Sequence, residues 1–384
     1  MKAARTLLFA GTALALAACA DQNPTAVQQR SPAPVLAARG VGIDGAYIVV
    51  VKEGADPRSV AAVAGVEPRY VYQAALHGFA GTLNAGQLNA LQHNPNVEYI
   101  EQDGVATIMT TQSSATWGID RIDQRSLPRS GTYTYNTTAS NVRAYIIDTG
   151  IQANHPQFGT RAAVSYDALG GNGADCNGHG THVAGTIGST TYGVAKGVLL
   201  RGVRVLNCQG SGSYSAIIAG IDWVRVNRVN PAVANMSLGG GLNSSLNTAA
   251  TNLANSGVFL AVAAGNENQN ACNVSPASAS GVFTTASSTS SDAKSSFSNW
   301  GSCVEAYAPG SSITSTWINS GTNTISGTSM ASPHVAGVAA LYKGTFGDAS
   351  SSTISSWIIN NATTGVITGN VTGTPNRLLY KSTL

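Results

Sequence analysis

The stretch GTSMASPHVAGVAALY, residues 327–342, joins small polar residues to an apolar run whose spacing predicts a helix. Ser329 stands near the expected helix start, where N–H groups lack partners inside the helix and the helix dipole favours negative charge. Ser332 lies further into the helix, and Pro333 is expected in its first turn, where a missing N–H costs little. His334 lies five residues beyond Ser329, an offset that does not bring the two side chains together. A base for Ser329 must therefore come from another part of the chain.

Around this stretch, apolar strand-like runs alternate with helices rich in small residues. Strands are predicted at residues 142–148, 203–206, 232–238 and 257–265, and helices at residues 181–188, 213–227, 245–257 and 332–343. Strands that are apolar on both faces imply a parallel sheet covered by helices. The sequence therefore predicts an α/β fold over residues 110–384, in three layers, with a mainly parallel sheet between helices.

Four polar residues fall where such a sheet holds its ligands, at strand ends and helix starts: Asp148, His179, Asn266 and Ser329. Each alone is more often a turn or cap residue. Together they are the groups that attack on a carbonyl requires. Ser329 would be the nucleophile and His179 its base, with Asp148 fixing the tautomer and stabilising the imidazolium. The Ser329 N–H and the Asn266 side-chain amide would bind the oxyanion.

Several segments carry a family resemblance. They are YIIDTG (145–150), NGHGTHVAG (177–185), NMSLGGG (235–241), AVAAGNEN (261–268) and SGTSMASPHVAG (326–337). With Asp, His and Ser in this order, the chain resembles the subtilisin-like serine proteases over nearly all of residues 110–384. The sequences of these segments resemble most closely those of the proteinase K and aqualysin branch of the family. The resemblance implies a subtilisin-like fold, a catalytic triad of Asp148, His179 and Ser329, and Asn266 in the oxyanion hole.

The same resemblance implies where substrate binds. The residues concerned are Tyr214, Ser237, Leu238, Gly239, Ala263, Ala264 and Gly265. Runs starting at Ser237 and at Tyr214 would flank an extended peptide as β-strands, and the peptide would add between them by backbone hydrogen bonds. The last three residues would wall the primary specificity pocket. Because these walls are small and uncharged, with no Asp or Glu evident, we expect a broad preference for apolar and aromatic side chains.

Residues 46–109 predict a smaller domain of the α+β type, in which Asn84 can cap a helix. The segment resembles the family's inhibitor-type propeptide, with a ferredoxin-like fold, which assists folding and then inhibits until it is degraded. Residues 47–108 carry three Lys/Arg against six Asp/Glu, net −3, and residues 110–384 carry fourteen against ten, net +4. Opposite charges favour docking. We expect the precursor to cut itself between Met109 and Thr110.

The first 45 residues predict an export signal and a spacer. Lys2 and Arg5 precede an apolar run that is too short to span a bilayer, which is typical of a signal peptide over residues 1–20. Residues 21–45 are polar, contain proline and predict a disordered linker. Two interpretations of Cys19 stay open. It lies in an A-x-A cleavage site that frees a soluble chain, or it ends a lipobox and carries lipid in the precursor.

Four cysteines follow the signal: Cys176, Cys208, Cys272 and Cys303. An even number in an exported chain predicts two disulfides, for which three pairings are possible. No C-x-x-C spacing occurs, which disfavours a zinc site. The resemblance to the aqualysin pattern implies the pairs Cys176–Cys208 and Cys272–Cys303.

The resemblance also implies structural calcium, although no cofactor is expected for catalysis. The main site would use the carbonyl groups of Ser280 and Val282, with Glu305 where the family has an Asp. Asp120 and Asp123 match a second calcium site of some relatives, or serve as surface turn residues.

Composition limits the other classes of function. Only 10% of the 384 residues are charged, and the net charge of +3 forms no basic stripe, which excludes nucleic acid as an expected partner. The sequence predicts a secreted, monomeric serine endopeptidase with polypeptide substrates and its own propeptide as inhibitor. A non-catalytic binding protein would be expected to lack a triad residue, and an esterase would not need the peptide groove.

Overall fold

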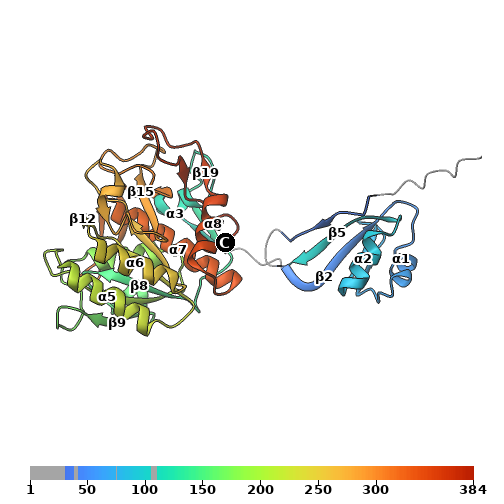
Figure 1. Cartoon of the computed structure of the whole chain (residues 1–384), viewed down its shortest axis with the longest axis horizontal. Helices are drawn as coiled ribbons and strands as arrows, with labels where there is room; N and C mark the ends of the chain where they lie inside the picture. Colours follow the sequence, from blue (N-terminus) through green and yellow to red (C-terminus); the bar gives the residue numbers. More distant parts are fainter. Residues whose placement is uncertain (1–30, 39–41, 75, 105–109) are drawn as a thin grey trace, which may run out of the picture. The chain divides into compact units, whose positions relative to one another are not determined.

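The computed structural model describes residues 31–38, 42–74, 76–104 and 110–384 (Figure 1). The chain divides into two compact units, Met1–Gly104 and Val105–Leu384. The two units have separate hydrophobic cores. The predicted signal peptide over residues 1–20, with Cys19, lies outside the described residues, as does Met109 at the expected cleavage bond.

The N-terminal unit is a five-stranded sheet with two helices. In spatial order its strands are β1 (Val35–Leu36), β5 (Val97–Gly104), β2 (Gly42–Val51), β4 (Gly78–Thr82) and β3 (Tyr70–Tyr72). Neighbouring strands are antiparallel except β1 and β5. Helix α1 (Pro57–Val63) contacts β4, and α2 (Ala85–Gln92) contacts β5. Asn84 caps α2 in a capping box with Gln87, so this helix begins where the sequence predicts.

Part of the segment that was expected to be a disordered linker belongs to this sheet. Val35 and Leu36 pair with Ile100 and Glu101 of β5, and Ala33 is buried in the core of the unit. Strand β2 already begins at Gly42. For these residues the linker prediction is wrong, because an exposed strand edge can pair with a short proline-containing segment whose composition carries no strand signal.

The C-terminal unit is built on a nine-stranded sheet. In spatial order its strands are β19 (Thr363–Thr364), β20 (Arg377–Leu378), β16 (Ala306–Pro309), β15 (Phe283–Ser288), β13 (Phe259–Ala263), β11 (Ala232–Met236), β8 (Arg143–Asp148), β10 (Leu199–Arg204) and β9 (Ala162–Asp167). Every pairing is parallel except that of β19 with β20. This is the mainly parallel sheet that the apolar runs predict.

Helices cover both faces of this sheet and make three layers. One face carries α3 (Trp117–Ile122), α4 (His179–Gly188), α7 (Thr328–Phe346) and α8 (Ser351–Asn361), and the other carries α5 (Tyr214–Asn227) and α6 (Ser244–Asn255). Strand β8 shows why two cores form. Ala144 and Ile146 belong to the first core, whereas Tyr145 and Ile147 point to the second. Figure 1 shows α5 and α6 side by side in this unit.

Short ribbons and one-turn helices complete the unit. The ribbons are β6 (Thr110–Ser113) with β7 (Thr132–Tyr135), β12 (Gly240–Gly241) with β14 (Val274–Ser275), and β17 (Ile313–Trp317) with β18 (Gly321–Ile325). The 3-10 turns are Pro156–Phe158 and Ala271–Asn273. Among the described residues, no helix combines the length and apolar character needed to cross a membrane.

Candidate functional site

Asp148 and His179 meet where β8 ends and α4 begins. The Nδ1 atom of His179 lies 2.7 Å from Oδ1 of Asp148, and the N–H of Thr149 donates to the same oxygen at 2.8 Å. Asp148 is fully buried, whereas the His179 side chain is 25% exposed. The carboxylate therefore holds Nδ1 as a hydrogen-bond donor and leaves Nε2 to accept a proton.

Opposing effects set the pKa of His179. Burial lowers it, but the charge of Asp148, the hydrogen bond that His179 donates to Asp148 and the charge of Asp175 together raise the pKa above its ordinary value of 6.5. The imidazolium is thus favoured at this position, which suits a group that must take a proton during a reaction.

Ser329 is the second residue of α7, directly after the N-cap Gly327 and Thr328. Its hydroxyl donates to the carbonyl oxygen of Ser237 at 3.1 Å. Among the described residues the hydroxyl makes no hydrogen bond to His179 in this structure. Proton transfer to the imidazole therefore requires the hydroxyl to turn away from Ser237, as is common in sites without substrate.

Pro333 explains a second hydrogen bond between Ser237 and Ser329, in which the backbone carbonyl of Ser329 is the acceptor. It is the sixth residue of α7, not in the first turn as predicted, because the helix already begins at Thr328. Pro333 has no N–H to donate to the carbonyl oxygen four residues earlier, which belongs to Ser329. That oxygen accepts from the Ser237 hydroxyl instead, at 2.7 Å.

The other serine and the histidine of this stretch are buried and bonded elsewhere. Ser332 donates to Oδ1 of Asn235 at 2.6 Å, and Nδ2 of Asn235 donates to the Ser237 hydroxyl at 2.8 Å. His334 bonds through Nδ1 to the carbonyl of Met330, and burial lowers its pKa to about 4. His334 is therefore neutral and structural, as its offset from the nucleophile predicts.

Asn266 is fixed beside the start of α7. Its Oδ1 accepts from both the N–H and the hydroxyl of Thr328, at 2.8 and 2.9 Å. A Cβ at Gly327 would lie 3.6 Å from the Ser329 nitrogen and 3.7 Å from Nδ2 of Asn266. The glycine thus keeps the space beside these two nitrogen atoms free of a side chain.

A pocket of about 260 Å³ adjoins Ser329 and Asn266. Its lining residues include Ala263 and Gly265, as the resemblance implied, together with Leu238, Gly239 and Glu267. Two details of the prediction are wrong. Ala264 is fully buried and is not a lining residue, because side chains alternate along the strand that it extends. The pocket also has an acid on its wall, Glu267, which lies in the loop after Asn266.

A second hollow, of about 550 Å³, continues past His179. Ser237, Leu238 and Gly239 line it on one side, and Tyr214 with the preceding loop lines it on the other. The run from Tyr214 is not the β-strand that we expected. Ser213 caps α5, the helix that the spacing of residues 213–227 predicts, so the backbone there does not run as an extended strand beside a peptide.

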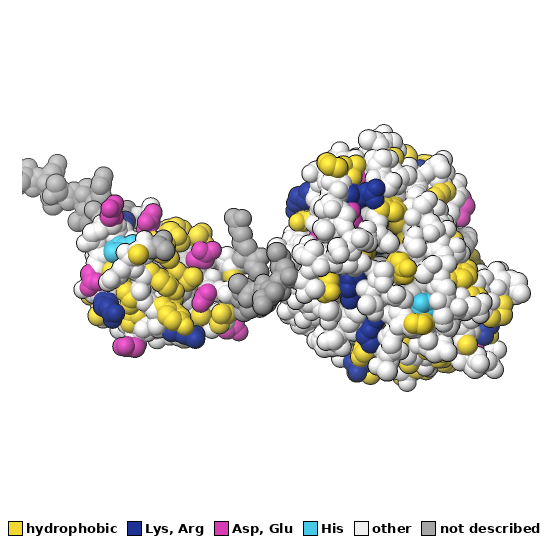
Figure 2. Space-filling view, turned by 180° about the vertical axis from the view of Figure 1, so that it is seen from behind, with side chains coloured by type: hydrophobic (Ala, Val, Ile, Leu, Met, Phe, Trp, Pro, Cys, Tyr) yellow, Lys and Arg dark blue, Asp and Glu magenta, His cyan; other side chains and the backbone are white. Residues whose placement is uncertain are grey.

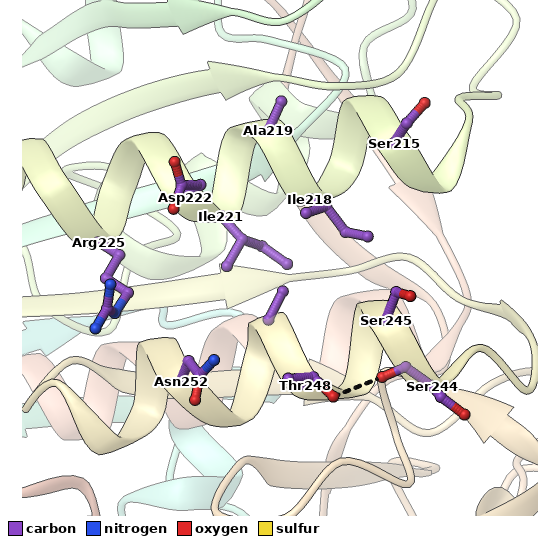
Figure 3. A pocket seen from close by; sticks show the side chains of 11 residues that line it. Ser215, Ile218, Ala219, Ile221, Asp222, Arg225, Ser244, Ser245, Thr248 and Asn252 are labelled. Atoms are coloured by element: carbon purple, nitrogen blue, oxygen red, sulfur yellow. Dashed lines mark hydrogen bonds between the residues drawn. The ribbon is translucent and has the colours of Figure 1, made fainter.

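Another groove lies between α5 and α6 and has a volume of about 610 Å³ (Figure 3). Ile218 and Ala249 form part of its apolar floor, and Asp222 and Arg225 lie near one end. The residues that line it in the described structure do not include Asp148, His179 or Ser329.

Two disulfides flank the site. Cys176 bonds to Cys208 and Cys272 bonds to Cys303, the pairs that the resemblance implied. The first bridge begins three residues before His179, and the second begins six residues after Asn266.

One of the two expected calcium sites has suitable chemistry. Glu305 and Val282, but not Ser280, line a pocket of about 430 Å³ that also presents several serine residues. Burial raises the pKa of Glu305 to about 8, with one carboxylate oxygen accepting from the N–H of Thr284. A bound cation would relieve the cost of ionising this buried carboxyl, and calcium prefers such oxygen ligands. Glu305 is thus the acidic side chain that this pocket offers a cation, and calcium binding stays a prediction.

The second expected calcium site finds no support. Asp120 accepts from the N–H groups of Ser130 and Gly131 and from the Ser130 hydroxyl. Asp123 accepts from Thr134 and pairs with Lys381 at 2.9 Å. These donors already occupy both carboxylates, so a cation would have to displace them. The described residues hold no cluster of three or more His, Cys, Asp or Glu that could bind a metal.

A buried Asp–His pair, with a serine at a helix start beside Asn266, is the set of residues expected of a serine hydrolase on an α/β sheet. Residues 140–378 match the subtilase family, and residues 46–109 match the peptidase inhibitor I9 family. The chain belongs to the subtilase family of serine proteinases, which are hydrolases, and it carries an I9 propeptide domain.

Relatives of known family are similar in sequence along nearly the whole chain. The chain is 48% identical to the extracellular serine proteinase of Thermus sp. (strain Rt41A), covering 96% of each chain. It is 52% identical to the subtilisin-like serine protease AsES of Sarocladium strictum, covering 96% of this chain and 97% of that one. A crystal structure of a cold adapted subtilisin-like serine proteinase is 51% identical, covers 70% of this chain and 99% of its own, and superposes with a TM-score of 0.69.

Proposed function

We propose that the chain is the precursor of a secreted serine endopeptidase that works through Asp148, His179 and Ser329. The observation that carries this proposal is the 2.7 Å bond from His179 to the buried Asp148, since Ser329 bonds to Ser237, which lines the same hollow as His179. The similarity to an extracellular proteinase supports secretion. No observation supports lipid at Cys19, and monomeric behaviour remains part of the proposal.

The chemistry follows from these positions. His179 takes the proton of the Ser329 hydroxyl through Nε2 while Oγ attacks the carbonyl carbon. The N–H groups of Ser329 and Asn266 bind the oxyanion, and the imidazolium then gives its proton to the leaving nitrogen as the C–N bond breaks. Water repeats the sequence on the acyl-enzyme and releases the second product.

The site should accept many side chains. The pocket beside Ser329 has small walls at Ala263 and Gly265, which supports a preference for apolar and aromatic residues. Glu267 adds a carboxylate, so lysine should also be accepted at low salt. Peptides that differ only at this residue, with Phe, Leu or Lys, would test the specificity. A preference for Lys over Phe at 1 M salt, where exposed charges are screened, would contradict it.

The N-terminal unit should act as an intramolecular inhibitor that the enzyme removes. Residues 47–108 carry a net charge of −3, opposite in sign to the +4 of residues 110–384. Figure 2 shows a broad apolar area and scattered acidic side chains on the visible face of this unit. Its exposed large apolar side chains are Val35, Leu36, Ile43, Val63 and Tyr70. Such a surface is suited to binding another protein surface.

Hydrolysis of casein and of a simple ester by the purified protein tests the function. The wild-type chain should mature and cleave both substrates, and the mature N-terminus should be Thr110. The Ser329→Ala variant should accumulate as uncleaved precursor and hydrolyse neither. Ester hydrolysis without proteolysis would identify an esterase instead. Maturation of Ser329→Ala at the wild-type rate, or a mature N-terminus before residue 47, would contradict the proposal.

A further inference from the structure

The helix that carries His179 receives its N-terminal hydrogen bonds from outside the helix. The N-cap of α4 is Gly178, which has a φ of 110° and no side chain to cap the first turn. Asn177, Thr149 and Asp175 accept from the N–H groups of His179, Gly180 and Thr181, respectively, and Asp175 also bonds to the loop before the helix. Oδ1 of Asp175 accepts from the N–H groups of Asn177 and Gly178, both at 2.9 Å. Its Oδ2 accepts from the N–H of Thr181 at 2.9 Å and from the Thr181 hydroxyl at 2.6 Å.

Thr149 connects this carboxylate to the one that contacts the imidazole. Its hydroxyl donates to Oδ1 of Asp175 at 2.9 Å and accepts from the N–H of Gly180 at 2.9 Å. Its backbone N–H donates to Oδ1 of Asp148. One buried residue thus bonds to both carboxylates and to the first turn of α4. The position of His179 relative to Asp148 therefore depends on Asp175 as well as on β8.

The titratable groups around the imidazole leave Asp175 as its second anionic neighbour. Asp148 faces His179 from β8, and Asp175 faces it from the loop that leads into α4. His182 follows on α4, and His334 lies on α7, which packs against α4. Burial lowers the pKa of both these histidines to about 4, so both are neutral near pH 7. The charge of Asp175 adds to that of Asp148 in raising the pKa of His179.

One cation reaches the same loop. Arg204, on β10, approaches the sulfur of Cys176 to 3.3 Å. It also pairs with Asp167 at 3.5 Å, which offsets its charge. The electrostatic potential at the start of α4 is therefore set mainly by the carboxylates of Asp148 and Asp175.

We propose that Asp175 is a positioning residue for the base: it locks the first turn of α4 against Asp148 and supplies a second negative charge that stabilises the His179 imidazolium. This inference rests on the proposed function, because it assigns a role to a residue behind the proposed base. A carboxylate that only capped the helix would affect folding without changing the acid limb of the pH profile, which separates the two roles.

The test compares Asp175→Asn with wild type in peptide hydrolysis from pH 5 to 9. Rates are taken per active site, titrated with a fluorophosphonate that labels reactive serines, so unfolded protein does not count. The variant should shift the acid limb of kcat/KM to lower pH by about 0.3–1 unit, since one of two anions near the imidazolium is lost. It should lower kcat about 10-fold or more, because misplacing a catalytic group is costly, while KM changes little.

Two further variants sharpen the result. Asp222→Asn, at an exposed carboxylate on α5, makes the same change in net charge and should leave the acid limb in place. Asp175→Glu restores the charge and should return the limb towards wild type. An acid limb in Asp175→Asn that coincides with wild type, or one that moves equally in Asp222→Asn, would overturn the proposal.

A measurement on wild type keeps the proposal testable if Asp175→Asn does not fold. Raising the salt concentration from 0.05 to 1 M should shift the acid limb of kcat/KM to lower pH. Asp175 is partly exposed, so its charge can be screened, whereas Asp148 is fully buried. A limb that does not respond to salt would overturn the proposal. Failure of the function itself is distinguished by Ser329→Ala. If that variant stays active, the triad is wrong, whereas an inactive Ser329→Ala with an unmoved limb rejects only the role of Asp175.

Discussion

The hydroxyl of Ser237 donates to the carbonyl oxygen of Ser329 at 2.7 Å, replacing the helical bond that Pro333 cannot make. The nucleophile is thereby tied to the segment that follows β11. Ser237 also accepts from Asn235, which in turn accepts from Ser332. The buried network joins the start of α7 to the centre of the sheet.

Ser237→Ala should therefore affect both stability and rate. The variant leaves the Ser329 carbonyl and the Asn235 amide unpaired, which should cost about 1–3 kcal/mol of unfolding free energy. We also expect kcat to fall while KM stays near wild type. Ser332→Ala, at the other end of the network, is the matched control. It should lose similar stability but keep most of its activity and still mature. Equal losses of kcat in the two variants would argue against a special role for the Ser237 bond.

Activity should fall on acidification with a midpoint above pH 6.5. The folded pKa of His179 is raised above this ordinary value by Asp148 and Asp175, against the opposing effect of burial. As the pH falls through that pKa, the imidazole becomes protonated and cannot take the serine proton. The acid limb of kcat/KM for a neutral peptide reports this pKa. A midpoint near pH 5 would place the essential base elsewhere.

Asn266→Ala should lower kcat by about 10²–10³-fold with a modest change in KM. That magnitude is taken from removal of one oxyanion-hole donor in an enzyme of this family. Thr328→Val should cost less, because it removes only one of the two bonds that orient the Asn266 amide. Steady-state kinetics on one peptide would rank the two variants, and the opposite order would contradict the assignment.

The disulfides should stabilise the enzyme without taking part in catalysis. Their sequence separations are 32 and 31 residues. Loops of this size correspond to about 3–4 kcal/mol in the chain-entropy account. Cys176→Ser should lower the melting temperature and reduce activity, since that bridge adjoins Asp175 and the loop before His179. Cys272→Ser should mainly lower the melting temperature. Complete inactivity of Cys272→Ser at low temperature would be inconsistent with this division.

Calcium should stabilise the protein through Glu305. At a free concentration 100 times its dissociation constant, a bound ion would add about 2.7 kcal/mol to the unfolding free energy. Thermal unfolding with calcium and with a chelator measures the effect. Glu305→Gln should lose the response, whereas Asp123→Asn should keep it, because Asp123 is committed to Lys381 and Thr134. If calcium still stabilised the Glu305→Gln variant, Glu305 would not be its ligand and the assignment would be contradicted.

The sequence alone determined the architecture and indicated the residues that we propose for the site. Strands apolar on both faces can be stable only inside a helix-covered sheet, and the carboxyl ends of parallel strands share one edge. For this reason Asp148, His179, Asn266 and Ser329 could be grouped before any coordinates were known. The helix signals around Asn84 and after Ser329 are local, and both helices form.

The tertiary structure decided which loop and edge groups face the cavities. Residues 31–38 contain no strand pattern, yet Val35 and Leu36 pair with β5, because edge pairing depends on a distant partner. Nothing local predicts that Glu267 lines the specificity pocket or that Ala264 does not. Asp175 is likewise a loop residue whose contacts the sequence does not predict. Its place in the sequence suggests a turn, and only the folded chain brings Thr149 and Thr181 to it. Periodicity reports which face of an element is buried, whereas the direction of a loop side chain is set by contacts between segments far apart in the chain.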